Sequence, residues 1–124
     1  MDHTQDWTRV DNGEPAGLDS GVTIHRIGRT NVGGDSPTYV ISVPGAREVT
    51  IDFQDGPVGD EGINGIQTEH LIMVALDRMR SFQKGKFACR ENALVVTKLE
   101  EALQWLHART HDRRKRQVEG KNEA

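Results

Sequence analysis

Apolar residues recur at helical spacing in two neighbouring stretches of the chain. The first stretch covers residues 67–82 and the second begins near position 89. Their apolar positions are Leu71, Ala75, Met79 and Phe82, with Ile72 and Leu76 alongside, then Val96, Leu99, Leu103 and Leu106. This period gives each helix one apolar face that can pack against a core. Residues 83–86 supply a short turn in which Gly85 can take a positive φ, so the helices are expected to be antiparallel neighbours. Thr68 is the expected N-cap of the first helix.

The N-terminal half of the chain carries a different pattern. Three short runs of β-branched residues with partial alternation predict strands at 22–27, 38–43 and 48–53. Between the third run and the hairpin, a glycine falls at every third position from Gly56 to Gly65. This segment is interpreted either as a flexible connector or as a loop whose bare backbone approaches a ligand.

Together these patterns predict an α+β fold, in which a small antiparallel β-sheet is followed by an antiparallel α-helical hairpin. The expected organisation is a poorly ordered acidic tail at 1–20, a β unit with a glycine-rich connector at 21–65, the helical hairpin at 66–118 and a short tail at 119–124. An apolar content of 35% leaves little material for a core. The chain is therefore expected to form a homo-oligomer through its helices.

The net charge of −3 conceals opposite charges at the two ends of the chain. Residues 1–20 are acidic, whereas residues 109–116 are basic, so an anionic partner is expected at the second end. No apolar run approaches the roughly 20 residues of a membrane helix, and no signal peptide is recognisable. The single cysteine, Cys89, fits a reducing compartment. These features predict a cytoplasmic protein that does not bind a membrane.

The residues that commonly carry catalysis do not form a recognisable set. His107 and His111 share a helical face, but two histidines crowded by arginines, without the glutamate of zinc proteases, give a weak metal signal. His111 and Asp112 resemble the His-Asp pair of metal phosphohydrolases, whose further ligands are not recognisable. Cys89 has no dyad partner and is interpreted as a buried small residue. The chain is therefore predicted not to be an enzyme and to need no metal or cofactor.

The candidate binding residues lie in the hairpin. The apolar stripe of the second helix is continued by Arg109 and Arg113, whose guanidiniums can bond a phosphate with two parallel donors or stack on a base. Complementarity to the helix dipole is the alternative explanation for these cations. Phe82 is either a core residue or a stacking platform, and Asn92 either supports the helix start or reads the edge of a base. Arg90 lies at the same helix start, where free N–H groups attract anions.

Helix length separates these candidates into two groups. Phe82 and Asn92 lie at the turn end of the predicted hairpin, while Arg109 and Arg113 lie at its far end. The seventeen residues from Asn92 to Arg109 correspond to about 25 Å at the helical rise. One chain cannot bring all four side chains onto a small ligand, but two hairpins paired antiparallel can. A two-fold or higher assembly is therefore part of the hypothesis.

Several stretches of the chain resemble one family of phage proteins. They are Asp55-Gly-Pro-Val, Gly62-Ile-Asn-Gly, Phe82-Gln, Phe87-Ala-Cys-Arg-Glu-Asn-Ala, Thr97-Lys-Leu-Glu-Glu-Ala-Leu-Gln-Trp-Leu and Val118-Glu-Gly. Together they span roughly residues 50–120 and look like the phage Thoeris anti-defence proteins of the first type. The Thr-Lys-Leu-Glu-Glu-Ala core also resembles the helical hairpin of phage anti-CBASS sponges, whereas the N-terminal third matches only in its general β character.

The resemblance implies a non-catalytic sponge that sequesters nucleotide immune signals. In this family the signals are glycocyclic ADP-ribose isomers made by bacterial TIR proteins, bound at interfaces within dimers and hexamers. Members also take up cyclic di- and trinucleotides, the latter in a separate pocket on a three-fold axis. Carried over by position, Phe82 would stack on adenine, Asn92 would hydrogen-bond the ligand, Arg109 would stack or clamp, and Arg113 would bond phosphate. Arg90 is assigned to the trinucleotide pocket from its charge and position alone.

The sequence thus predicts a phage inhibitor that binds cyclic ADP-ribose-type signals and cyclic oligonucleotides without cleaving them, and so blocks Thoeris and CBASS immunity. The first alternative is a nucleic-acid-binding regulatory protein that grips phosphates through residues 113–116. Net negative charge and the lack of an obvious base-reading element count against it. The second alternative is a phosphodiesterase that degrades the signal.

Overall fold

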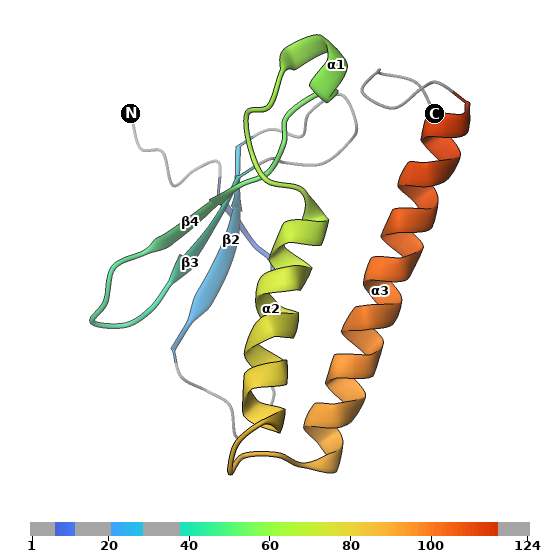
Figure 1. Ribbon diagram of the computed structural model, residues 1–124. Helices are drawn as coiled ribbons and strands as arrows, with labels where there is room; N and C mark the ends of the chain where they lie inside the picture. The colour runs from blue at the N-terminus through green and yellow to red at the C-terminus, as the bar shows by residue number, and fades with distance from the viewer. Residues whose placement is uncertain (1–6, 12–20, 29–37, 117–124) are drawn as a thin grey trace. The chain divides into compact units, whose positions relative to one another are not determined.

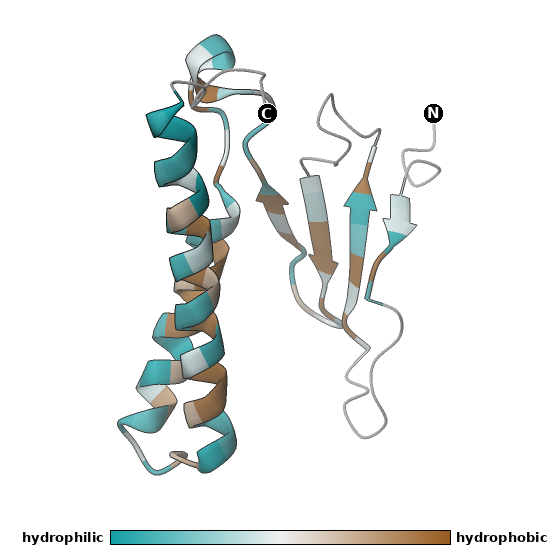
Figure 2. Cartoon of the chain, turned by 90° about the vertical axis from the view of Figure 1, so that its right-hand side faces the viewer, coloured by the Kyte–Doolittle hydropathy of each residue, from teal (hydrophilic) through white to brown (hydrophobic). Residues whose placement is uncertain are grey.

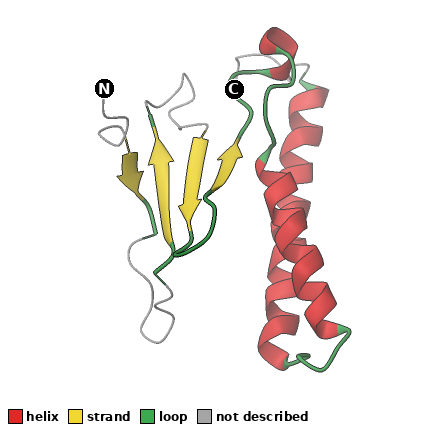
Figure 3. Ribbon diagram, turned by 90° about the vertical axis from the view of Figure 1, so that its left-hand side faces the viewer, coloured by secondary structure: helices red, strands yellow, loops and turns green. Residues whose placement is uncertain are grey.

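The computed structural model describes residues 7–11, 21–28 and 38–116, and the chain divides into two compact units (Figure 1). Unit 1 comprises Met1–Gly56 and Ile63–Gly65 and carries the strands, whereas unit 2 comprises Pro57–Gly62 and Ile66–Ala124 and carries the helices. The predicted α+β class, with strands preceding a helical hairpin, is confirmed (Figure 3). Over the described ranges, no helix has the length and apolar character that crossing a membrane requires.

Unit 1 is an antiparallel sheet in which each strand pairs with the next one along the chain. Its strands are β1 (Trp7–Arg9), β2 (Thr23–Ile27), β3 (Thr38–Ser42) and β4 (Val49–Asp52). The last three are the predicted strands. Ile24 lies opposite Ile41, and Tyr39 lies opposite Ile51 and meets the Phe53 ring edge-on at 5.6 Å. Among the described residues of this unit, Val40 in the middle of β3 is buried, with 4% of its surface exposed.

Strand β1 lies within the segment for which the sequence predicts an acidic tail. Its Trp7 ring lies 5.6 Å from the His25 ring on β2. Directly after the strand, the Asp11 carboxylate accepts hydrogen bonds from the Ile24 backbone N–H at 2.8 Å and from Arg9 Nε at 2.9 Å. Asp11, an acidic residue of the expected tail, thus stabilises the pairing of the edge strand β1 with β2. Residues 1–6, 12–20 and 117–124, on which the other tail predictions fall, lie outside the described residues.

The glycine-rich segment 54–65 is closed by its own hydrogen bonds and contains the four-residue helix α1 (Val58–Glu61), so it is more ordered than a flexible connector. Asn64 Oδ1 accepts from the Asp55 N–H, and Asn64 Nδ2 donates to the Asp55 carbonyl, both at 2.8 Å. The Asn64 N–H donates to Gln54 Oε1 at 3.0 Å. Asn64 therefore links the two ends of segment 54–65 through hydrogen bonds to Gln54 and Asp55.

Unit 2 is built on the predicted hairpin of α2 (Thr68–Gln83) and α3 (Arg90–Lys115), which lie side by side and antiparallel (Figure 1). Among the described residues of this unit, Leu76 and Leu103, one from each predicted apolar stripe, are buried, with 3% and 9% of their surfaces exposed. Helical periodicity therefore identified both helices and the buried side of α3, whereas Leu71 and Ala75 of the predicted α2 stripe are exposed.

Three local predictions in the hairpin are wrong. Gln67, not Thr68, is the N-cap of α2, because the Gln67 N–H donates to His70 Nδ1 at 2.9 Å and the helix starts one residue later. Gly85 does not take a positive φ, since consecutive N–H to carbonyl bonds across three residues carry the chain around the turn. Cys89 is exposed rather than buried, because it is the N-cap of α3.

The hairpin leaves much of its apolar surface uncovered, and the hydrophobic colouring of its helices is visible in Figure 2. The large apolar side chains of unit 2 that are more than one-third exposed are Leu71, Met73, Val74, Phe87, Leu94, Val95 and Trp105. Leu94 and Trp105 are about three helical turns apart and therefore share one face of α3. Trp105 is 71% exposed. A face of this kind is typical of a surface that associates with another molecule.

Replacing a buried leucine of the hairpin should cost far more stability than replacing an exposed neighbour on the same helix. Leu76→Ala leaves a cavity and is expected to lower the free energy of unfolding by about 2–5 kcal/mol. Val74, two residues earlier, is 67% exposed, and its alanine variant is the matched control, with an expected change within about 0.5 kcal/mol. Urea denaturation followed by circular dichroism measures both. Equal losses would show that α2 does not pack through the Leu76 face.

Two glycines provide a second stability test. A Cβ on Gly65 would lie 2.5 Å from the carbonyl carbon of Phe53, so Gly65→Ala must displace backbone and is expected to destabilise the chain by about 1–3 kcal/mol. A Cβ on Gly85 would lie 3.9 Å from the Ser81 carbonyl oxygen, an ordinary contact, and Gly85→Ala is expected to stabilise the chain by about 0.4–1 kcal/mol. Thermal unfolding of the two variants compares them, and opposite signs are expected. A loss of stability in Gly85→Ala would mean that the turn needs glycine after all.

Candidate functional site

Asn92 and Phe82 face the turn end of the hairpin, where α2 ends and α3 begins. Asn92 is half-buried, its N–H donates to Cys89 Sγ at 3.4 Å, and its Nδ2 donates to the Phe87 carbonyl at 3.1 Å. Asn92 thus supports the helix start, as one of its two sequence interpretations requires. These bonds leave Asn92 Oδ1 as the acceptor that a ligand could use. Arg90, the first residue of α3, is exposed at the same end.

Phe82 belongs to a cluster of alternating rings and cations, which we call the aromatic cluster: Arg78, Phe82, Phe87 and Lys86. The two phenylalanine rings meet edge-to-face, with centroids 6.2 Å apart and an interplanar angle of 84°. The Arg78 guanidinium carbon lies 4.8 Å from the centre of the Phe82 ring, and Lys86 Nζ lies 5.4 Å from the centre of the Phe87 ring. The cluster therefore offers π surfaces for a base and cations for an anion within one turn region.

Sequence reasoning overlooked three members of this cluster. Phe87 was part of a recognised stretch but was not weighed for chemistry, although it is 63% exposed. Arg78 precedes Phe82 by four positions, the spacing at which helical side chains touch, and this signal was available in the sequence. Lys86 contacts Phe87 from the neighbouring position in the turn, and no periodicity predicts such a contact.

Arg109 and Arg113 lie near the C-terminal end of α3, whose last turns are hydrophilic (Figure 2). Arg109 is exposed and lies four residues beyond Trp105, so it shares the exposed apolar face of the helix. Arg113 is half-buried. Nearby, Arg116 Nε pairs with an Asp112 carboxylate oxygen at 3.2 Å, which reduces the local positive charge.

Within one chain, the structure does not bring the predicted site residues together. Asn92 and Arg109 belong to the same continuous helix and are seventeen residues apart, about 25 Å along its axis. Phe82, the last residue but one of α2, accompanies Asn92 at the turn end. The four candidate residues therefore fall into two groups at opposite ends of the hairpin, which we call the aromatic and the basic candidate half-sites.

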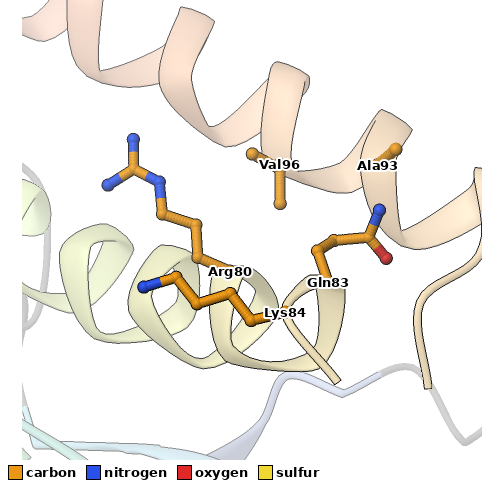
Figure 4. A pocket seen from close by; sticks show the side chains of 5 residues that line it. All are labelled: Arg80, Gln83, Lys84, Ala93 and Val96. Atoms are coloured by element: carbon orange, nitrogen blue, oxygen red, sulfur yellow. The ribbon is translucent and has the colours of Figure 1, made fainter. Parts of the chain in front are cut away.

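A separate pocket of about 370 Å³ lies between the end of α2 and the start of α3 (Figure 4). Its lining consists of Arg80, Gln83, Lys84, Ala93 and Val96. Val96 and Ala93 supply the apolar part, and the cationic ends of Arg80 and Lys84 project on the same side of it (Figure 4). The lining includes the residues that follow Phe82 and Asn92 but neither of these two. Arg80 also donates to a Glu100 carboxylate oxygen at 2.9 Å, which offsets part of its charge.

The histidines and acidic residues do not gather into a metal site within the part of the chain that the structure describes, where no group of three or more His, Cys, Asp or Glu side chains could hold an ion. His107 and His111, the helical pair considered from the sequence, are both exposed. The aromatic cluster, Asn92 and the arginines of the hairpin offer rings, an amide and guanidiniums, which suit binding of an anionic ligand that carries a base.

Comparison with known proteins agrees with this assignment of the hairpin. The family described as "Acb2/Tad1, hairpin domain" matches residues 45–111, more than half of the chain, and the matched region includes Phe82, Arg90, Asn92 and Arg109 but ends before Arg113. The chain is also similar to the protein named "Thoeris anti-defense 1" of Bacillus phage SBSphiJ7, with 45% identity over 91 residues. That alignment covers 73% of this chain and 64% of the relative, so the chain spans less than two thirds of the relative's length. On this evidence the chain belongs to the Acb2/Tad1 hairpin-domain family.

Proposed function

We propose that this protein is a phage anti-defence sponge, which binds cyclic ADP-ribose-type immune signals and holds them without cleavage. The observation that carries the proposal is the family match across the hairpin, which contains the aromatic half-site and Arg109. The relative is named for its action against Thoeris. We infer that this chain acts in the cytoplasm of an infected bacterium, on the glycocyclic ADP-ribose that the family resemblance implies is made by TIR proteins. Binding and sequestration would then deny the signal to its receptor.

The chemistry of the two half-sites supports this ligand class. A cyclic ADP-ribose presents an adenine and a pyrophosphate. The Phe82 ring can stack on the adenine, and Asn92 Oδ1 can accept from its exocyclic amine. Arg109 and Arg113 can each bond a phosphate with two donors, or stack on the base from the other side. Cyclic di- and trinucleotides have the same combination of bases and phosphates, and the proposal extends to them, with Arg90 as the assigned contact for trinucleotides.

A complete site requires two chains in this proposal. Because the half-sites lie at opposite ends of the hairpin, an antiparallel arrangement of two hairpins would place Arg109 of one subunit beside Phe82 and Asn92 of its neighbour. Arg109 shares a helix face with the exposed Trp105, so an interface through that face would carry the guanidinium toward the partner. The proposed assembly is a dimer, or a hexamer built from such dimers.

The affinity that sequestration demands is within reach of such a site. A nanomolar Kd corresponds to about −12 kcal/mol. Stacking of a base on an aromatic ring contributes about 1–3 kcal/mol, and each hydrogen bond to a charged group about 1.5–3 kcal/mol. Two arginines, one ring and the amide account for a large part of the total, and burial of the ligand between subunits supplies the remainder.

Removal of either half-site should abolish capture while the fold survives. Phe82→Ala and Arg109→Ala are each expected to weaken binding of glycocyclic ADP-ribose by at least about 100-fold, because each removes a group that contacts the ligand. Isothermal titration calorimetry measures the affinity, and circular dichroism checks folding. Arg114→Ala is the matched control, since it removes the same charge from the same helix end. If Arg114→Ala reduced affinity as much as Arg109→Ala, the C-terminal cations would act as a general anion patch, as the nucleic-acid alternative requires.

Mixing the two inactive variants extends this test to the assembly. In a dimer of one Phe82→Ala and one Arg109→Ala subunit, one of the two shared sites keeps both residues. Random re-association should therefore restore about a quarter of the full binding capacity. A site formed within one chain would recover nothing, and that outcome would contradict the two-chain arrangement.

A heat-release experiment distinguishes a sponge from an enzyme. Protein in excess is incubated with glycocyclic ADP-ribose and then denatured by heat, and the supernatant is examined by chromatography. A sponge is expected to remove the free signal before heating and to return it intact afterwards. A product of altered mass, or a signal that disappears with substoichiometric protein, would support the phosphodiesterase alternative.

A further inference from the structure

The contact between Arg78 and Phe82 bears directly on how a base reaches the ring. The guanidinium carbon lies 4.8 Å from the ring centre, which is within the range of a cation–π contact. Phe82 is half-buried, whereas Arg78 is exposed. The two residues are four apart on α2, the spacing at which helical side chains touch, so the exposed Arg78 guanidinium covers one face of the ring.

A second ring also contacts Phe82. Phe87 meets it edge-to-face at 84°, and Lys86 in turn covers the Phe87 ring at 5.4 Å. A base that stacks on the face of Phe82 covered by Arg78 has to take the place that the guanidinium occupies. An exposed cation–π contact is weak, about a two- to fivefold factor in an equilibrium constant, so a base can displace it.

A displaced Arg78 guanidinium does not leave the site. It remains on a long, flexible stem one turn before Phe82, beside whatever is attached to the stacked base. If that attachment carries a phosphate, the freed guanidinium gains a charge-assisted, bidentate partner that replaces the lost ring contact. If it is an uncharged ribose, the guanidinium gains no such partner and the displacement is a net loss.

On the basis of the proposed function, we propose that Arg78 is a specificity-determining ligand contact, which leaves the Phe82 ring when a base stacks there and binds the phosphate attached to that base. Through this exchange the site favours phosphorylated adenine compounds over nucleosides. In the empty protein the guanidinium also shields the ring from uncharged aromatic compounds. Arg78 thus adds a third arginine to the two at the far end of the hairpin, and it acts from the same subunit as Phe82.

The test uses two probes that share adenine and differ in phosphate: ADP-ribose and adenosine. Arg78→Ala is expected to weaken ADP-ribose binding by at least about tenfold, since it removes a charged hydrogen-bond partner. The same variant should bind adenosine as well as the wild type or about two- to fivefold more tightly, since the base no longer displaces a cation. Titration calorimetry of the full chain measures both affinities. Arg80→Ala, two residues along α2, is the matched control and should leave the ratio of the two affinities unchanged.

The opposite directions for the two probes make the inference falsifiable. If Arg78→Ala weakens both probes to the same extent, Arg78 only holds the ring in place, and the exchange is wrong. If it changes neither affinity while Phe82→Ala abolishes both, the exchange is also wrong but the proposed stacking site stands. If Phe82→Ala leaves both probes bound, the proposed site itself fails. Melting curves of each variant ensure that only folded protein is compared.

Discussion

The unbroken length of α3 is the constraint on which the rest of the molecule depends. The helix runs from Arg90 to Lys115 without interruption, so the groups at its two ends are held apart by a rigid rod. A small ligand therefore meets either the aromatic cluster or the basic end of a given chain, but not both. In the proposed assembly this separation is useful, because two antiparallel hairpins place the basic end of each subunit beside the aromatic cluster of the other. One pair of subunits therefore forms two complete sites, one at each end. A kinked or shorter helix would lose that geometry even if every side chain were kept.

Much of the fold could be predicted because hydrophobic periodicity decides it. The stripes containing Leu76 and Leu103 identified both long helices and their contact, and β-branched runs identified β2 to β4. Strand β1 was missed because three residues in an acidic context carry no period, and what fixes them is a partner strand and the Asp11 carboxylate. Local details of the hairpin, such as its helix cap, were predicted wrongly for a similar reason. The cap at Gln67 depends on a bond from its N–H to a histidine ring nitrogen, and helix-cap statistics do not predict that bond.

The placement of the proposed site residues at two ends of the hairpin was predictable from the sequence, but their local contacts were not. Ring, amide and guanidinium are the groups that recognise a base and a phosphate, and their positions on two helices followed from counting residues. Apolar periodicity does not predict the contact between Arg78 and Phe82, because Arg78 is exposed and lies outside the apolar stripe of α2. A search for cation–aromatic pairs at four-residue spacing would have found it. By contrast, the contact of Lys86 with the Phe87 ring depends on the backbone conformation of the turn, and residue spacing does not predict that conformation.

Few side chains of the described hairpin are buried within one chain, and this property connects its stability, its proposed assembly and its proposed ligand binding. A hairpin that buried its own apolar faces would be stable alone and would have no surface on which to form a shared site. Here Trp105 and its neighbours stay exposed in one chain, so on the proposed assembly the interface and the ligand site arise in the same step. Any ligand that bridges two subunits then stabilises their association in proportion to the logarithm of its concentration over Kd, about 4 kcal/mol at a thousandfold excess. In the proposed assembly, a bound signal would leave only when the subunits separate or the helix ends at the site unfold locally. Slow dissociation, which a sponge needs, would then follow from the positions of the two half-sites.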